Sequence, residues 1–271
     1  MRIEDLRTGE SIEKAQMMGL VRGIQACKDS IGQTLMICLA EKELLVAAVA
    51  YASWLAGVSF FALPNEQMNR TCESQALSMF DQVVYVDDID HFRVASLTPI
   101  EVVGTPSLIM ATSGTSGALK IVPHPFPSDD ERLFSGNRLL LDVTGWLRGM
   151  NTWISIPPRH ILPMYALLYT LQYGGDVYLG PSSKAKFMNT SQTIWWLAGA
   201  REVESCDKWT PNTIRHVVSV VTTGAPVSVE AKLRAARIVG ADKLHEFYGM
   251  TEGIGMTHLS GADWLDNPGS V

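Results

Sequence analysis

The 271-residue sequence has no apolar stretch long enough to cross a bilayer. Its longest apolar run, from Leu44 to Gly57, contains Ser53 and falls short of the roughly 20 residues that a membrane-spanning helix needs. The N-terminus, MRIEDLRTGE, is polar and acidic, whereas a secretory signal would be basic and then apolar. These absences predict a cytoplasmic protein without a membrane partner.

The chain is also poor in cysteine and in positive charge. Its four cysteines are Cys27, Cys38, Cys72 and Cys206. They form no C-x-x-C pair, which argues against zinc or a disulfide framework and favours buried thiols in a reducing compartment. The formal net charge of -6 argues against nucleic acid as the main partner. The hydrophobic content of 46% and the length fit a globular enzyme of one large domain or two lobes.

Strand-like and helix-like segments alternate along most of the chain, with no internal repeat and no low-complexity tract. We predict strands at 35–39, 58–63, 82–86, 107–111, 120–123, 152–156, 177–179, 217–222 and 244–247, and helices at 41–56, 66–80, 128–143, 163–173, 191–200 and 228–239. This alternation predicts an α/β protein built of βαβ units, with largely parallel sheets flanked by helices. A division into subdomains of residues 1–105 and 106–271 fits the pattern.

A loop rich in glycine and hydroxyl residues, TSGTSGALK, runs from Thr112 to Lys120 between two strand-like segments. Glycine lets a backbone turn come close to a ligand, and the exposed N–H groups of such a turn attract anionic oxygens. The loop is therefore a candidate phosphate site, with Lys120 as a point charge. A flexible loop without a ligand is the alternative. The glycine spacing differs from that of the Walker-type ATPases.

Two later strands end in small or chemically active residues. The strand 217–222 is followed by Thr223-Gly224-Ala225-Pro226, and the strand 244–247 by Tyr248-Gly249-Met250-Thr251-Glu252. Ligands of open α/β sheets bind beyond the carboxyl ends of the strands, so both segments are candidate site residues. Taken alone, Tyr248 would be interpreted as a core aromatic rather than a ligand contact, and Glu252 could be a solvated strand end.

In order along the chain, the motifs TSGTSGALK, HILPMYALLYTLQYGG, TTGAP, YGMTE and PGSV resemble those of the adenylate-forming superfamily. That superfamily includes acyl- and aryl-CoA ligases, luciferases and the adenylation domains of peptide synthetases. The resemblance covers about residue 35 to the end of the chain. It implies an N-terminal AMP-binding domain over residues 1–271, and ATP-dependent activation of a carboxylic acid followed by transfer to a thiol. The thiol would belong to CoA or to the pantetheine arm of a carrier protein.

The resemblance also implies a role for each residue of these motifs. The pyrophosphate clamp would consist of Thr112, Ser113, Gly114, Thr115, Ser116, Gly117 and Lys120. Thr251 would donate its hydroxyl to the α-phosphate and Glu252 would hold Mg²⁺, which favours a carboxylate together with phosphate oxygens. Tyr248 would stack on adenine, with Gly224, Ala225 and Pro226 as the other wall. Gly249 and Met250 would face the acyl group, for which Trp153 and Tyr165 are further candidate walls.

His160 matches a histidine that many acyl- and aryl-CoA ligases carry at the mouth of the acyl pocket. The alternative is a histidine at a helix start, bonded to the backbone. Arg159 would suit a second acidic group on the substrate, or is simply exposed. The segment between Trp153 and Gln172 has no acidic residue to pair with a substrate ammonium, which disfavours an α-amino acid as substrate.

The sequence departs from the family in three places. Leu119 replaces the proline usual before the loop lysine, and Pro123 lies in the strand that follows. The chain ends at Val271, where family members continue into a hinge and a small lid domain with a catalytic lysine. We therefore expect a fragment of a longer enzyme or a naturally reduced member, poorly active by itself and dependent on a separate C-terminal domain. The competing hypotheses are a non-catalytic module that binds nucleotide or acyl-adenylate, and a structural or interaction protein.

Overall fold

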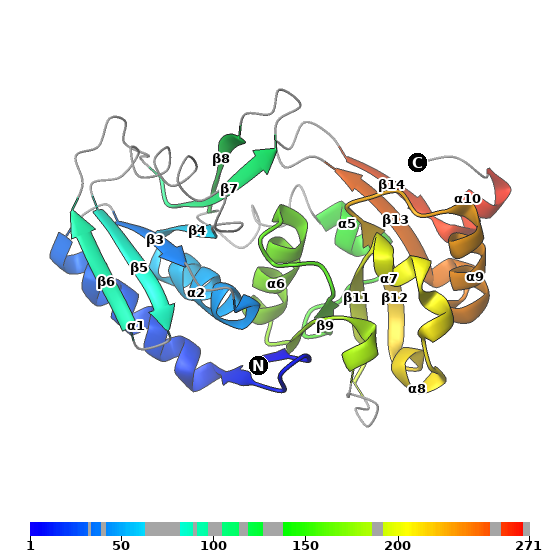
Figure 1. Ribbon diagram of the computed structural model, residues 1–271, viewed down its shortest axis with the longest axis horizontal. Coiled ribbons are helices and arrows are strands. Elements are labelled where there is room, and N and C mark those ends of the chain that lie inside the picture. The colour runs from blue at the N-terminus through cyan, green and yellow to red at the C-terminus, as the bar shows by residue number, and fades with distance from the viewer. Residues whose placement is uncertain are drawn as a thin grey trace. The chain divides into compact units, whose positions relative to one another are not determined.

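The computed structural model describes residues 1–31, 34–38, 42–62, 82–88, 91–96, 105–113, 119–126, 138–185, 192–249 and 256–267 (Figure 1). The chain divides into two compact units. The first contains residues 1–11, 134–157 and 165–271, and the second contains residues 12–133 and 158–164. Strands and helices alternate in both units, so the predicted α/β class is confirmed. Among the described residues, no helix is long and apolar enough to span a membrane.

An eight-stranded sheet forms the centre of the first unit, in the order β14-β13-β12-β11-β9-β10-β1-β2. The strands are β1 (Arg2–Asp5), β2 (Ser11–Glu13), β9 (Asn151–Ile154), β10 (Val177–Leu179), β11 (Ile194–Gly199), β12 (Val217–Thr223), β13 (Leu244–Gly249) and β14 (Met256–Ser260). From β1 to β13 the neighbouring strands pair in parallel, and β14 pairs antiparallel with β13. The carboxyl ends of β9 to β13 therefore lie at one edge of this sheet.

Short helices connect these strands. They are α5 (Arg138–Val143), α6 (Ile161–Gln172), η1 (Ser182–Lys184), α7 (Ala200–Glu204), η3 (Cys206–Lys208), α8 (Pro211–Ile214), α9 (Val229–Val239), η4 (Ala241–Lys243) and α10 (Gly261–Asp266). Helices α9 and α10 pack on each other and on β13 (Figure 1). Helix α9 presents Ala231 and Ala235, four residues apart on one face, to the core of this unit.

Tryptophans dominate the core beside this sheet. The rings of Trp153 and Trp196 stack with centroids 4.0 Å apart, and Trp209 lies 4.8 Å from Trp196. Each stacked indole has a hydrogen-bond acceptor: Trp153 Nε1 donates to the carbonyl of Gly180 and Trp196 Nε1 to Ser155 Oγ, both at 2.8 Å. Trp153 is fully buried in this stack, so its predicted position on the wall of an acyl pocket is wrong.

The second unit contains a six-stranded sheet in the order β6-β5-β3-β4-β7-β8. Its strands are β3 (Thr34–Cys38), β4 (Ser59–Ala62), β5 (Gln82–Asp88), β6 (His91–Ser96), β7 (Ser107–Ser113) and β8 (Leu119–Pro125), and its helices are α1 (Lys14–Ile31) and α2 (Glu43–Ala56). Helix α2 is buried along almost its whole length and ends at Gly57, whose φ of 62° is the left-handed conformation of a helix C-terminus. Lys28 of α1 donates from Nζ to the carbonyls of Ala56 and Gly57, both at 3.2 Å.

One predicted element is wrong. We predicted a helix at 191–200, but residues 194–199 form β11. The segment Ile194-Trp-Trp-Leu-Ala198 is buried on both faces, and so short an apolar run has no periodicity that separates a helix from a central strand. Its bulky aromatic residues favour the strand.

The other predicted strands are present within a few residues of their expected bounds, as are the helices at 41–56, 163–173 and 228–239. The helix predicted at 66–80 and the start of the one at 128–143 lie outside the described residues, while α5 confirms the latter's end at Val143. Helix α1 and the strands β1, β2, β6 and β14 were not predicted. Cys206 is a buried free thiol, as expected, and Cys27 is half-buried.

Candidate functional site

Two neighbouring strands of the first unit carry predicted site residues at the same edge. Strands β12 and β13 pair in parallel, with Thr222 opposite Glu246 as the last paired residues. Thr223 ends β12 and the turn Gly224-Ala225-Pro226 follows it directly, while Tyr248-Gly249 ends β13. The structure therefore brings both predicted nucleotide walls to adjacent strand exits, where open α/β sheets bind ligands.

The turn after β12 is exposed and fixed at its far end. Gly224 has a φ of 90°, and a Cβ added there would meet nothing within 4 Å, so the glycine is needed for its backbone conformation. Ser228 then caps α9 by accepting a hydrogen bond from the N–H of Ala231. Ser228 also donates to the carboxylate of Glu204 in α7, from its N–H at 2.5 Å and from its hydroxyl at 2.9 Å. These two hydrogen bonds lower the pKa of Glu204.

Tyr248 is exposed rather than part of the core. It keeps 58% of its surface accessible, and Met256, which lies opposite Gly249 on β14, keeps 45%. An aromatic ring in this position has a free face for a planar ligand. The alternative of a core aromatic therefore does not apply to Tyr248.

A buried polar cluster lies directly below these two strand exits. Lys232 of α9 forms an ion pair with Glu246 of β13, with Nζ and Oε2 2.5 Å apart, and its Nζ lies 5.0 Å from the ring centre of Trp264 in α10. The two charged side chains are only 10% and 13% exposed. Together with Thr222 they line a small cavity. Within the described part of the chain, Thr222 Oγ1 and Trp264 Nε1 are buried without a hydrogen-bond partner.

The sequence analysis did not predict this cluster, although the sequence contains a signal for it. Glu246 is a carboxylate within a strand that is otherwise mostly buried, and Lys232 follows Ala231 on the inward side of an amphipathic helix. A charged residue is rarely buried unless it has a partner. A charged residue on the buried face of one element therefore predicts a residue of opposite charge on the buried face of its neighbour.

A pair of histidines joins β13 to β14. His245 Nδ1 and His258 Nε2 lie 3.1 Å apart, and the two rings are stacked. Burial lowers the pKa of His245 to about 4, helped by the charge of His258 and opposed by Asp242. Burial also lowers the pKa of His258. Both imidazoles are therefore neutral at pH 7.

The predicted phosphate loop belongs to the second unit. Strands β7 and β8 pair antiparallel, with Thr112 opposite Lys120 and Ser113 opposite Leu119. The loop is therefore the tip of a hairpin, as its position between two strand-like segments predicted. Its tip residues Gly114, Thr115, Ser116 and Gly117 lie outside the described residues, as do Met250, Thr251 and Glu252.

His160 directly precedes α6, and its carbonyl accepts a hydrogen bond from the N–H of Met164 at 3.1 Å. His160 is an exposed residue. Partial desolvation by the surrounding chain nevertheless lowers the pKa of its imidazole. One helical turn on, burial raises the pKa of Tyr165 to about 12, so its phenol stays protonated. A histidine at a helix start is thus observed, and this placement is compatible with both roles considered for His160.

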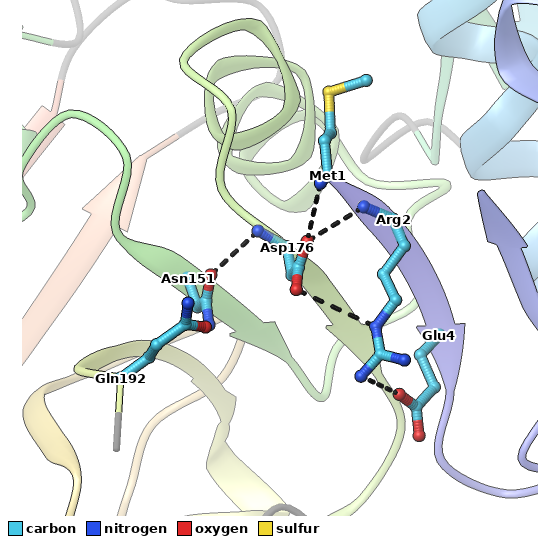
Figure 2. A network of polar contacts seen from close by, with 6 residues as sticks. All are labelled: Met1, Arg2, Glu4, Asn151, Asp176 and Gln192. Carbon is cyan, nitrogen blue, oxygen red and sulfur yellow. Dashed lines mark hydrogen bonds and ion pairs between the residues drawn. The ribbon is translucent and has the colours of Figure 1, made fainter. Parts of the chain in front are cut away.

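The opposite edge of the eight-stranded sheet, where its parallel strands begin, carries a polar network (Figure 2). Asp176, just before β10, accepts from the backbone N–H of Arg2 at 3.0 Å and lies 3.2 Å from the amino group of Met1. Its own N–H donates to Asn151 Oδ1 at 2.9 Å, and Asn151 Nδ2 donates to Gln192 Oε1 at 2.5 Å. These residues stand at the amino ends of β1, β9, β10 and β11. Their contacts join the beginnings of these strands to one another.

No group of three His, Cys, Asp or Glu side chains in the described ranges could hold a metal ion. The predicted Mg²⁺ ligand, Glu252, follows the end of β13 by three residues.

Solved structures of known enzymes share this fold. A malonyl-CoA ligase with methylmalonyl-CoA and AMP bound aligns with a TM-score of 0.68 and 20% identity, covering 96% of this chain and 59% of that one. O-succinylbenzoate coenzyme A synthetase from Bacillus subtilis in complex with AMP aligns with a TM-score of 0.71 and 19% identity, covering 99% and 60%. An amide bond synthetase from Marinactinospora thermotolerans aligns with a TM-score of 0.66 and 18% identity, covering 96% and 59%. The chain thus spans about three fifths of the length of these proteins, and at such identities the likeness establishes the fold alone.

Residues 58–271 match the family described as AMP-binding enzyme. This range includes the β7–β8 hairpin, the turn after β12 and the end of β13, where the ordered motifs lie. Because the match covers well over half of the sequence, the chain belongs to the AMP-binding enzymes, the adenylate-forming family that its motifs predicted.

Proposed function

We propose that the protein uses ATP to activate a carboxylic acid as an acyl-adenylate, and then passes the acyl group to a thiol. The observation that carries this proposal is the turn Gly224–Pro226 beside the exposed ring of Tyr248, at the exits of two neighbouring parallel strands. A flat aromatic face and a close backbone wall are suited to a nucleotide base. Similar solved structures hold AMP, ATP with magnesium, and methylmalonyl-CoA with AMP, which supports the same chemistry for this chain.

In the proposed first step, a carboxylate oxygen of the acid attacks the α-phosphorus of ATP. The bond between the α-phosphorus and its bridging oxygen to the β-phosphate breaks, and pyrophosphate leaves. The hairpin loop from Thr112 to Lys120 would bind the β- and γ-phosphates through backbone N–H groups, hydroxyls and the lysine charge. Thr251 would donate to the α-phosphate, and Glu252 would hold Mg²⁺, which offsets phosphate charge when bound.

In the second step, the sulfur of a thiolate attacks the acyl carbon, and AMP leaves. CoA and a carrier-protein pantetheine present the same thiol chemistry. The segment between β9 and the end of α6, which includes His160, has no acidic side chain to pair with an ammonium group. We therefore propose an acyl or aryl acid rather than an α-amino acid as the substrate, with Gly249, Met250 and His160 near the acyl group.

Pyrophosphate exchange into ATP, measured with a panel of acyl, aryl and amino acids, tests this function. We expect exchange that depends on an acyl or aryl acid and is lost in Glu252→Gln. A matched control is Glu230→Gln, which removes an exposed carboxylate from the first turn of α9 and leaves exchange intact.

A thermal-shift measurement with a non-hydrolysable acyl-adenylate mimic separates the other outcomes. Binding of the mimic without any acid-dependent exchange would identify a non-catalytic binding module. Absence of both binding and exchange would exclude the proposed function and leave a structural or interaction protein.

A further inference from the structure

The ion pair between Lys232 and Glu246 connects the two elements that carry the proposed nucleotide walls. Glu246 lies two residues before Tyr248 on β13, and it is opposite Thr222, the last paired residue before the turn after β12. Lys232 lies in the first turns of α9, the helix into which that turn leads. The pair therefore joins the far end of the turn to the strand that ends in Tyr248.

The ammonium group of Lys232 lies against one carboxylate, that of Glu246, and one aromatic ring, that of Trp264. Its Nζ is 2.5 Å from Glu246 Oε2, and the ring of Trp264 in α10 lies 5.0 Å away, where a cation is attracted to the face of an indole. The side chain is only 10% exposed, so water has little access to take the place of Glu246. Removing either member of such a pair leaves a buried charge uncompensated, which destabilises the packing of α9 against β13.

The backbone pairing of β12 with β13 ends at Thr222 and Glu246, so it does not extend to the turn Gly224–Pro226 or to Tyr248. The turn Gly224–Pro226 is exposed, and the hydrogen bonds that Ser228 donates to Glu204 at its far end lie at the surface. The cavity below the strand exits leaves Thr222 Oγ1 and Trp264 Nε1 without a hydrogen-bond partner among the described residues. The ion pair is therefore a buried polar tie between α9 and β13, in addition to the apolar packing of Ala231 and Ala235.

We propose that Lys232 and Glu246 are positioning residues, which hold the turn Gly224–Pro226 and the ring of Tyr248 at the separation that an adenine nucleotide needs. Neither residue has to contact the ligand. This inference rests on the proposed function, because it concerns the same nucleotide site. It predicts that nucleotide affinity depends on the ion pair beyond the pair's effect on folding.

The test compares two variants of the whole chain that each lose one buried or partly buried ion pair. Lys232→Met breaks the pair below the strand exits, and Asp176→Asn breaks the network at the amino ends of the strands (Figure 2). The dissociation constant of AMP is measured by calorimetry at a temperature where both variants are folded. We expect Lys232→Met to raise it on the order of 10-fold, and Asp176→Asn to leave it within about twofold although its melting temperature falls.

The double variant Lys232→Met with Glu246→Gln separates positioning from folding. It removes both charges, so it should regain melting temperature relative to Lys232→Met, because no buried charge is left without a partner. Its AMP affinity should stay reduced, because the tie between α9 and β13 is still missing.

Three results would overturn the inference while leaving the proposed function intact. They are an unchanged AMP affinity in Lys232→Met, an equal loss in Asp176→Asn, and a return of affinity together with stability in the double variant. If the unmodified chain binds neither AMP nor the acyl-adenylate mimic, the proposed function fails, and the inference fails with it.

Discussion

At the scale of single residues, Tyr248 offers the most direct test of the site. Tyr248 keeps 58% of its surface accessible, so replacing it should change ligand binding far more than folding. Stacking of a base on an aromatic side chain contributes about 1 to 3 kcal/mol. We therefore expect Tyr248→Ala to raise the dissociation constant of AMP roughly 10-fold, as measured by calorimetry.

Urea unfolding supplies the control for this variant. The free energy of unfolding of Tyr248→Ala should stay within about 0.5 kcal/mol of the unmodified protein, as for other exposed substitutions. Tyr248→Phe keeps the ring and should keep the affinity. An unchanged AMP affinity in Tyr248→Ala would contradict the assignment of its ring to the nucleotide base.

The sequence predicted individual residues best where local chemistry restricts the choice. Gly224 was predicted to form a turn at a strand exit, and it adopts a positive φ that other residues avoid. Trp153 was placed wrongly, because an aromatic residue in a strand suits a pocket wall and a core equally well. Its partner in the core, Trp196, lies 43 positions away in the chain. Only the strand order, which brings β9 beside β11, decides between the two.

At the scale of elements, the histidine pair makes the β13–β14 ladder sensitive to acid. The pKa of His245 falls from its ordinary 6.5 to about 4 in the folded chain, mainly because of burial. Between these two values the unfolded chain binds more protons than the folded chain, so stability rises with pH through this window and is lost as pH falls. We expect His245 to account for about 2 kcal/mol of destabilisation between pH 7 and pH 5.

Urea unfolding at both pH values, for the unmodified chain and for His245→Gln, checks this prediction. The variant should be less stable at pH 7 but should lose less stability on acidification, because glutamine does not titrate. His160 and His258 also have lowered pKa values, and they remain present in both proteins. An equal acid effect in the two proteins would show that His245 is not the group responsible.

The elements were predictable where the hydrophobic periodicity was clear or where a residue such as glycine marks the end of a helix. Helix α2 ends at Gly57 as predicted, because glycine provides the left-handed conformation at a helix end. Strand β11 was mistaken for a helix, because burial on both faces removes the alternation by which a strand is identified. Strand β6, which pairs antiparallel with β5 at the end of its sheet, was also missed.

At the scale of the whole molecule, the two edges of the eight-stranded sheet carry different kinds of residues. Parallel pairing from β1 to β13 collects all the amino ends at one edge and all the carboxyl ends at the other. The amino edge carries the saturated network around Asp176, whose groups satisfy one another. The carboxyl edge carries an exposed turn and an exposed ring. The motifs predicted which strand ends carry site residues. Only the strand order shows that these strand ends are neighbours.

Tryptophan fluorescence can follow the unit that carries the proposed nucleotide walls. Of the seven tryptophans, Trp54 belongs to the second unit and all the others to the first. In a Trp54→Phe background, the fluorescence change during urea unfolding therefore reports on the first unit alone. AMP at 100 times its dissociation constant should stabilise that unit by about 2.7 kcal/mol, because it binds the folded chain and not the unfolded one.

The same AMP concentration gives a smaller expected shift in Tyr248→Ala. If this substitution raises the dissociation constant 10-fold, the ligand is then present at only about 10 times that constant, and the stabilisation falls to about 1.4 kcal/mol. The difference between the two shifts thus measures the contribution of Tyr248 without calorimetry. Equal shifts in the two proteins would mean that AMP binds away from the exits of β12 and β13, because the ring would then have no part in the complex.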